Sequence, residues 1–273
     1  MPTAKINGID INFERHGEAG EPLVFIHGFT GDISDWRFQA EPFGRTNQLL
    51  VFDNRGHGAS EAPKDRSTYS IEQMASDAEA LIAEVGFERY HLLGHSMGGA
   101  IAQEIALRSQ GRLLSLALED TAPLFEISKN EMLSKLSAAR NTIAETQGMG
   151  ALAKWKSPLP SPPHMPKERE AEVAARLSHM SVDAFIGAQA GLNDWKGSLD
   201  RLASIVVPAL VVVGSLDFGP LVGAARLMAD KVRNGTLEVI PEAGHSPQYE
   251  RPELFNAVLR RHLDSATAVS SAK

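Results

Sequence analysis

The sequence predicts an α/β fold, in which a mostly parallel β-sheet is flanked by helices and has an antiparallel edge at its N-terminal end. Three observations support this. Short apolar segments bounded by turn residues recur along the chain, as expected for strands buried on both faces of a sheet. Segments of helical periodicity lie between several of them, and a hairpin pattern opens the chain. The apolar segments are residues 23–26, 49–52, 91–93, 113–118, 210–213 and 237–240.

The first element is predicted to be a β-hairpin. Residues 4–6 and 9–13 form two short strand-like segments, and apolar residues alternate in the second. They are joined by Asn7-Gly8, a pair that favours the positive φ angles of a tight turn between antiparallel strands.

Helices are predicted for three segments that follow predicted strands. Residues 71–85 have a candidate N-cap in Ser70 and are followed by Gly86. Residues 97–108 and 252–263 have the same periodicity, and the last begins with a proline, which suits a first helical turn.

The alternation of strands and helices stops between about residues 123 and 200. This region is helical in tendency, but residues 156–166, KSPLPSPPHMP, place five prolines in eleven positions, which excludes a helix or a central strand there. The final residues, DSATAVSSAK, are small and mostly polar. We therefore expect a core in two parts, 1–123 and 204–264, a helical cap at 124–203 and a disordered tail at 265–273.

Composition narrows the classes of function. The 273 residues carry a net charge of −7, which argues against nucleic acid or an anionic membrane as the main partner. There is no cysteine, hence no disulfide, thiolate nucleophile or cysteine-bound zinc. We find neither a signal-peptide pattern near the N-terminus nor an apolar run of about 18 residues. We expect a cytoplasmic protein with a small-molecule substrate; a homodimer is compatible with the sequence.

Ser96 is the candidate nucleophile. It lies in LGHSMGG, between a predicted strand and a predicted helix, with Gly94 and Gly98 each two residues away. A serine on such a sharp turn projects its hydroxyl above the carboxyl edge of the sheet, and side chains at the glycine positions would collide with the neighbouring elements. The simpler alternative is a serine that caps a helix.

A serine hydroxyl needs a base, and His245 is the strongest candidate among nine histidines. It follows the last predicted strand in EAGHSP, and loops at the carboxyl ends of parallel strands converge. We expect His57 to organise its own glycine-rich loop and His27 to bond local backbone. His95 adjoins the serine, but its side chain should point away from it.

The base needs an acid that orients the ring, and Asp217 in GSLD also follows a predicted strand. Asp120, after residues 113–118, is the rival acid. The oxyanion of an acyl-transfer intermediate needs N–H donors. We predict the backbone N–H of Met97, next to the serine, and that of Phe29 in the HGFTG loop.

Taken together, HGFTG, DNRGHGAS, GHSMGG, GSLD and AGHSP occur in the order and spacing of the α/β-hydrolase superfamily, which the sequence resembles over residues 20–123 and 204–264. The resemblance implies an eight-stranded sheet, a triad in the order Ser, Asp, His, and a variable cap between strands six and seven. The core is similar to 3-oxoadipate enol-lactone hydrolases and cofactor-free haloperoxidase-like esterases. HGFTG is also similar to the menaquinone-pathway lyase. A serine at position 96 argues against dehalogenases and epoxide hydrolases, which use a carboxylate.

No cofactor or metal is expected, because GHSMGG lacks the G-x-G-x-x-G pattern and no helix carries histidines at ligand spacing. The cap has no obvious arginine cluster for a polyanionic substrate, although Arg37 and Arg55 leave that open. The candidate substrate-contacting residues are Trp36, Phe218, Trp155 and Trp195.

The predicted function is cleavage of a carboxylic ester or lactone by a serine hydrolase through an acyl-enzyme. The alternatives are a C–C bond hydrolase or lyase with the same triad, a perhydrolase, and a ligand receptor that keeps the fold.

Overall fold

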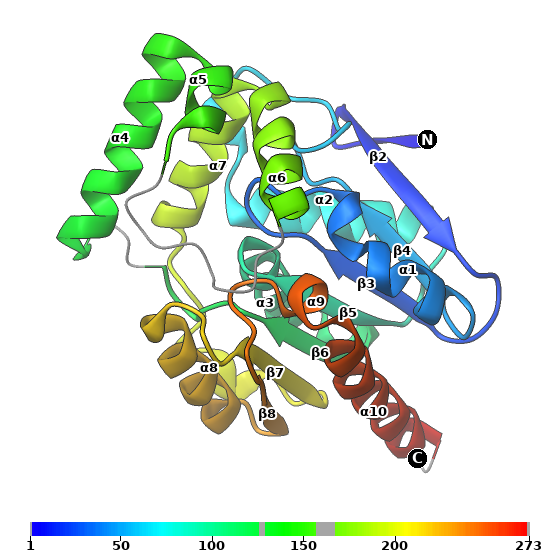
Figure 1. Cartoon of the computed structure of the whole chain (residues 1–273). Helices are drawn as coiled ribbons and strands as arrows, with labels where there is room; N and C mark the ends of the chain where they lie inside the picture. Colours follow the sequence, from blue (N-terminus) through cyan, green and yellow to red (C-terminus); the bar gives the residue numbers. More distant parts are fainter. Residues whose placement is uncertain (1, 126–128, 157–166, 272–273) are drawn as a thin grey trace.

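A computed structural model describes residues 2–125, 129–156 and 167–271. Its centre is one eight-stranded sheet, as the resemblance implied (Figure 1). The strands are β1 (Thr3–Ile6), β2 (Ile9–His16), β3 (Pro22–Ile26), β4 (Gln48–Phe52), β5 (Tyr90–His95), β6 (Leu113–Glu119), β7 (Ala209–Gly214) and β8 (Gly235–Ile240).

The strand order is β1-β2-β4-β3-β5-β6-β7-β8. β2 pairs antiparallel with both β1 and β4, and the pairs from β4 to β8 are all parallel. In the central register Ile26 lies beside Gly94, and Gly94 beside Leu118. The carboxyl ends of β3, β5 and β6 therefore meet at one edge of the sheet. The mostly parallel α/β fold with an antiparallel edge is confirmed.

Helices cover both faces of the sheet because its strands are apolar on both sides. Val24 and Ile26 face the layer that contains α2 and α3, whereas Leu23 and Phe25 face the layer of α1 and α10. The core helices are α1 (Arg37–Gly44), α2 (Ile71–Glu84), α3 (Met97–Ser109), α8 (Gly219–Lys231), α9 (Pro247–Glu250) and α10 (Pro252–Ser271), with short 3₁₀ turns at Ile33–Trp36, Arg66–Thr68, Gln110–Arg112 and Leu202–Ser204.

Among the described residues between β6 and β7, where we expected the cap, the chain forms four helices. They gather beyond the carboxyl edge of the sheet, at the upper left of Figure 1. They are α4 (Glu131–Gln147), α5 (Met149–Lys154), α6 (Lys167–His179) and α7 (Val182–Asp194). All of the proline-rich segment except residue 156 lies outside the described residues.

The C-terminal segment differs from the disordered tail that we expected at 265–273. Helix α10 continues to Ser271, Ala266 is buried, and the Thr267 hydroxyl donates a hydrogen bond to Glu21. The burial of Ala266 and the Thr267 hydrogen bond stabilise a helix that the small polar composition of this segment does not predict. Residues 272 and 273 lie outside the described part.

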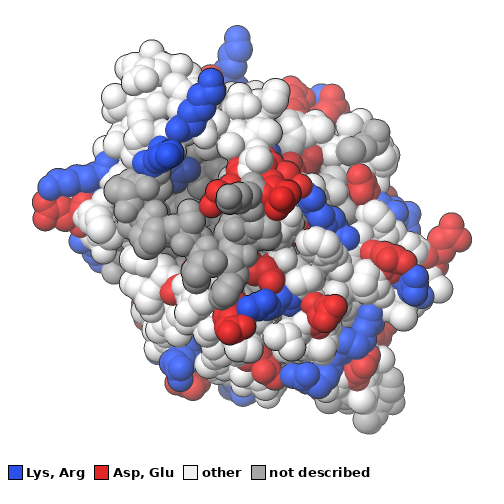
Figure 2. Space-filling model, in the orientation of Figure 1, with Lys and Arg blue, Asp and Glu red and all other residues white. Residues whose placement is uncertain are grey.

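None of the described helices combines the length and the apolar character needed to cross a bilayer. On the face shown in Figure 2, the basic and acidic side chains of the described residues are interspersed.

Candidate active site

Ser96 occupies the turn between β5 and α3, in a backbone conformation that L-residues rarely adopt (φ 53°, ψ −114°). A Cβ on Gly98 would collide with the carbonyl oxygen of Ile26, and one on Gly94 would collide with that of Gly98. The two glycines thus let strand and helix approach closely enough for the sharp turn. This geometry is that of a nucleophile elbow.

The structure brings together the three residues that we proposed as a triad. His245 Nε2 lies 3.0 Å from Ser96 Oγ, and Nδ1 of the same ring lies 3.0 and 3.1 Å from the two carboxylate oxygens of Asp217. Ser96 follows β5, Asp217 follows β7 and His245 follows β8. A proton on Nδ1 leaves Nε2 as an acceptor, so the ring can receive the serine proton.

The electrostatics of the pair suit an imidazole that becomes charged. Burial by itself lowers the pKa of His245, but the hydrogen bond and charge of Asp217 outweigh it, and the net pKa is raised. The side chain of Asp217 is only 3% exposed. Burial raises its pKa, yet hydrogen bonds from His245 and other donors lower it below its usual value overall. Asp217 is therefore ionised at neutral pH.

Asp120, the rival acid, is fully buried directly behind Asp217 and does not contact His245 through any described hydrogen bond. Its Oδ1 accepts a hydrogen bond from the Gly214 N–H at 3.0 Å, whereas Oδ2 has no described donor. Burial, followed by the charge of Asp217, raises the pKa of Asp120 well above its ordinary value. We therefore assign a proton to Asp120, which lets it donate to Asp217.

The loop after β3 lies against the serine. A Cβ on Gly28 would be 3.1 Å from Ser96 Cβ, so the loop approaches the turn as closely as glycine allows. Among the described residues, neither the Phe29 N–H nor the Met97 N–H makes a hydrogen bond. Met97 also begins α3, whose first N–H groups have no partner within the helix. Both predicted donors are free to bind an oxyanion.

Three other histidines are buried beside this site and shape its loops. His95 Nε2 lies 2.7 Å from the carbonyl oxygen of His245, and this hydrogen bond holds the backbone of the candidate base in place. His57 bonds the carbonyl of Arg55, and His27 accepts a hydrogen bond from the Asn54 N–H. Burial lowers the pKa of both His95 and His57 to about 3, so each is neutral. None of the three contacts Ser96 through a described hydrogen bond.

A cavity of about 830 Å³ opens onto Ser96 and His245 beneath the cap. Phe218 lines it, where we expected substrate contact. Its described walls are mostly apolar and contain no carboxylate. The described lining residues are Phe29, Thr30, Ser96, Ala122, Pro123, Leu124, Phe125, Lys129, Asn130, Leu133, Arg140, Leu192, Leu199, Phe218, Pro220, Leu221, Gly223, Ala224, Leu227 and His245. Such a lining suits an organic ligand with few polar groups.

The three predicted tryptophan contacts lie elsewhere. Trp36 is 1% exposed and packs 4.9 Å from the ring of Phe25, in the core layer of α1 and α10. Trp195 is buried, and its indole N–H donates to Glu104. Trp155 lines a neighbouring surface hollow beside α4. For Trp36, the position beside the oxyanion loop did not determine which way the side chain turns.

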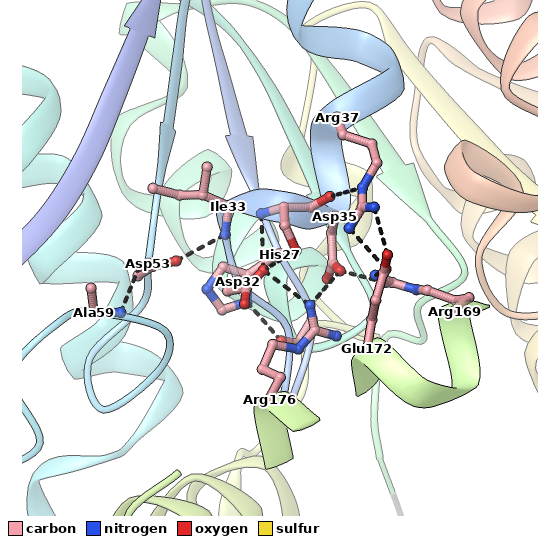
Figure 3. A network of polar contacts seen from close by, with 12 residues as sticks. His27, Asp32, Ile33, Asp35, Arg37, Asp53, Ala59, Arg169, Glu172 and Arg176 are labelled. Carbon is pink, nitrogen blue, oxygen red and sulfur yellow. Dashed lines mark hydrogen bonds and ion pairs between the residues drawn. The ribbon is translucent and has the colours of Figure 1, made fainter. Parts of the chain in front are cut away.

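The cap is joined to the core by a network of ion pairs (Figure 3). Arg169 and Arg176, both on α6, converge on Asp35 in the turn after the Phe29 loop. Arg176 Nη1 also lies 3.0 Å from Asp32. Although burial alone would raise the pKa of Asp35, the two arginines hold it well below its usual range. The network fixes α6 beside the loop that carries Phe29.

The arginines that we considered for an anionic substrate are occupied. Arg37 pairs with Glu172 through two contacts of 2.8 Å, and Arg55 pairs with Asp77 at 2.8 and 2.9 Å. Neither lines the cavity. Arg140 on α4 does line the cavity, but it belongs to no sequence motif and was not predicted. The apolar wall from α8 was also missed, although Pro220-Leu221 closely follow Asp217.

The described residues include one group of acidic and histidine side chains close enough to hold a metal: Asp120, Asp217 and His245, whose ligand atoms lie within 4.8 Å of one another. Both ring nitrogens of His245 are already within hydrogen-bonding distance of Asp217 and Ser96. Hydrogen bonding accounts for this cluster without a metal.

Comparison with known proteins agrees with the fold. The family model for the alpha/beta hydrolase fold matches residues 21–252. A dihydrolipoyllysine-residue acetyltransferase component of the acetoin cleaving system from Cupriavidus necator is 30% identical over 95% of this chain and 68% of its own length. A 3-oxoadipate enol-lactonase from Acinetobacter baylyi is 27% identical over 95% and 96%. The solved structure of a Thermogutta terrifontis esterase has a TM-score of 0.86 and 26% identity, covering 97% of this chain and 99% of that one. The chain belongs to the α/β-hydrolase family.

Proposed function

We propose that this α/β hydrolase cleaves a carboxylic ester or lactone, with Ser96 as nucleophile, His245 as base and Asp217 as acid. The observation that carries the proposal is the hydrogen-bonded chain from Ser96 Oγ through His245 to Asp217, with contacts of 3.0 to 3.1 Å. The similarity to an enol-lactonase and an esterase supports the same reaction class.

The proposed reaction has two stages. His245 takes the proton of Ser96 as the hydroxyl oxygen attacks the ester carbonyl, and the N–H groups of Phe29 and Met97 stabilise the oxyanion. The imidazolium then protonates the departing alcohol, leaving an acyl group on Ser96. Water, deprotonated by His245, attacks this acyl-enzyme; the imidazolium then returns the proton to the departing Ser96 oxygen as the acid is released. Asp217 remains ionised and stabilises the imidazolium in both stages.

A fluorophosphonate probe tests the nucleophile. We expect stoichiometric labelling of the wild type and none of Ser96→Ala; Ser265→Ala, which removes a hydroxyl from α10, should label like the wild type. Equal labelling of wild type and Ser96→Ala would refute the assignment.

The reaction class is tested with p-nitrophenyl esters and lactones of increasing chain length. Hydrolysis that depends on Ser96 is the expected result. Labelling of Ser96 without turnover of any member would instead favour the lyase or receptor alternative.

A further inference from the structure

Arg140 places a positive charge in the wall of the cavity that contains Ser96. It lies on α4, and its guanidinium carbon is 5.8 Å from the ring of Phe29 and 5.0 Å from that of Phe185. The two rings are themselves 5.2 Å apart, so they form an aromatic support for the cation. The backbone N–H of Phe29 is one of the two predicted oxyanion donors. Arg140 therefore contacts the side chain of a residue whose backbone lies at the predicted oxyanion site.

No carboxylate neutralises this arginine within the described structure. Arg140 has no described hydrogen bond or ion pair, and no described residue lining the cavity is acidic. By contrast, Arg169 and Arg176 on α6 both pair with Asp35 (Figure 3). Burial lowers the pKa of Arg140, and no neighbouring charge opposes this. The guanidinium nevertheless stays protonated at neutral pH.

A half-buried guanidinium without an anionic partner carries a desolvation cost that a bound anion would offset. Its planar fork matches a carboxylate, which it binds through two parallel hydrogen bonds. The remaining walls are mostly apolar and favour a hydrocarbon chain. A substrate that satisfies both features has an ester carbonyl at Ser96 and a free carboxylate at the far end of a short apolar chain.

We propose that Arg140 binds a substrate carboxylate, so that the cavity selects the monoester of a dicarboxylic acid over a neutral ester. This inference rests on the proposed function, since it names the substrate class of the same cavity. A single arginine serves one carboxylate, so the proposal does not need the arginine cluster that a polyanionic substrate would require.

The first experiment compares diethyl esters of glutaric, adipic, pimelic and suberic acid with their monoethyl esters. An esterase without a carboxylate site converts the diester and accumulates the monoester. Here we expect the monoester of at least one acid to be cleaved with a kcat/KM at least about 10-fold higher than that of its diester. A change of this size corresponds to the free energy of one charge-assisted hydrogen bond. Equal or lower values throughout the series would overturn the proposal.

Arg140→Gln then separates the carboxylate site from the general hydrolase. We expect it to lower kcat/KM for the preferred monoester by about 10- to 100-fold, while the diester changes less than about threefold. Arg140→Lys should restore part of the preference. Lys135→Gln is the matched control, because it removes one positive charge from an exposed side of the same helix and should leave the preference intact. Loss of both activities in parallel would contradict a specific role.

A binding measurement distinguishes failure of this inference from failure of the proposed reaction. Adipate monoethyl ester is titrated calorimetrically into Ser96→Ala and into Ser96→Ala with Arg140→Gln. At least about 10-fold weaker binding in the double variant supports the carboxylate site even if no ester is turned over. Equal affinity in the two variants refutes it, whatever the fluorophosphonate experiment shows about Ser96.

Discussion

Replacing Asp217 with asparagine tests the proposed relay most directly. Both carboxylate oxygens lie 3.0 to 3.1 Å from His245 Nδ1 and accept the hydrogen bond that its N–H donates. An asparagine amide would present a donor to the same nitrogen, and the ring would then carry its proton on Nε2, facing Ser96. In that tautomer the ring cannot accept the serine proton. We expect kcat to fall by about 10⁴, equivalent to about 5.5 kcal/mol in the barrier.

The pH profile provides a second measure of the same substitution. His245 acts as a base only when neutral, so kcat/KM falls as the pH drops through the pKa of the ring. Asp217 raises that pKa above its ordinary value despite the opposing effect of burial. Asp217→Asn removes the charge, and the acid limb of the profile should move to lower pH while the plateau drops. Initial rates of p-nitrophenyl ester hydrolysis between about pH 5 and 9 measure both effects.

Asp120→Asn is the matched control. Asp120 is buried behind Asp217, and its raised pKa keeps it protonated, so an asparagine amide can replace its donated hydrogen bond. We expect kcat to fall less than about 10-fold. A crippling effect of Asp120→Asn with a mild effect of Asp217→Asn would refute the assignment of the acid.

Three further predictions concern stability. Asp35→Asn leaves the buried Arg169 and the partly buried Arg176 without their shared carboxylate and should lower the free energy of unfolding by about 3–5 kcal/mol, measured by urea denaturation; an unchanged midpoint would contradict the role of the network. Gly98→Ala should destabilise the protein by about 1–3 kcal/mol and abolish ester hydrolysis, because its Cβ meets a carbonyl of β3, whereas Gly150→Ala in α5, where the space is open, should do neither. Burial lowers the pKa values of His57 and His95 to about 3, so below about pH 6.5 both residues take up protons when the protein unfolds. Each should therefore lower the free energy of unfolding by up to about 1.4 kcal/mol per unit of falling pH. If the free energy of unfolding of a His95→Gln variant had the same dependence on pH as the wild type between about pH 4 and 6, this reasoning would be refuted.

The sequence predicted the parts of the site that depend on strand ends and local turns. Ser96, Asp217 and His245 each follow a strand of the parallel sheet, and parallel strands bring their carboxyl ends to one edge. The glycines around Ser96 indicated a sharp turn because only glycine permits the close approach seen there. The position of Phe218 at the cavity was predicted for the same reason, because this residue directly follows Asp217 at the end of a strand.

The direction of a loop side chain could not be predicted in this way. Trp36 lies only seven residues after Phe29, yet at the end of the 3₁₀ turn Ile33–Trp36 it packs into the other core layer. The helical end of α10 was missed because Ala266 and Thr267 gain their contacts from distant parts of the chain.

By itself, therefore, the sequence determined the α/β architecture, the elbow around Ser96 and the order of the three proposed catalytic residues, since each follows from the periodicity, turn chemistry or strand ends of short segments. Only the tertiary structure decided which charges are neutralised. Arg169 pairs with Asp35, which is 134 residues away in the sequence, whereas Arg140 packs against two aromatic rings and lines an apolar cavity. The physical reason is that burial and pairing of a charge depend on how separate elements pack, and no local pattern in the sequence records that packing.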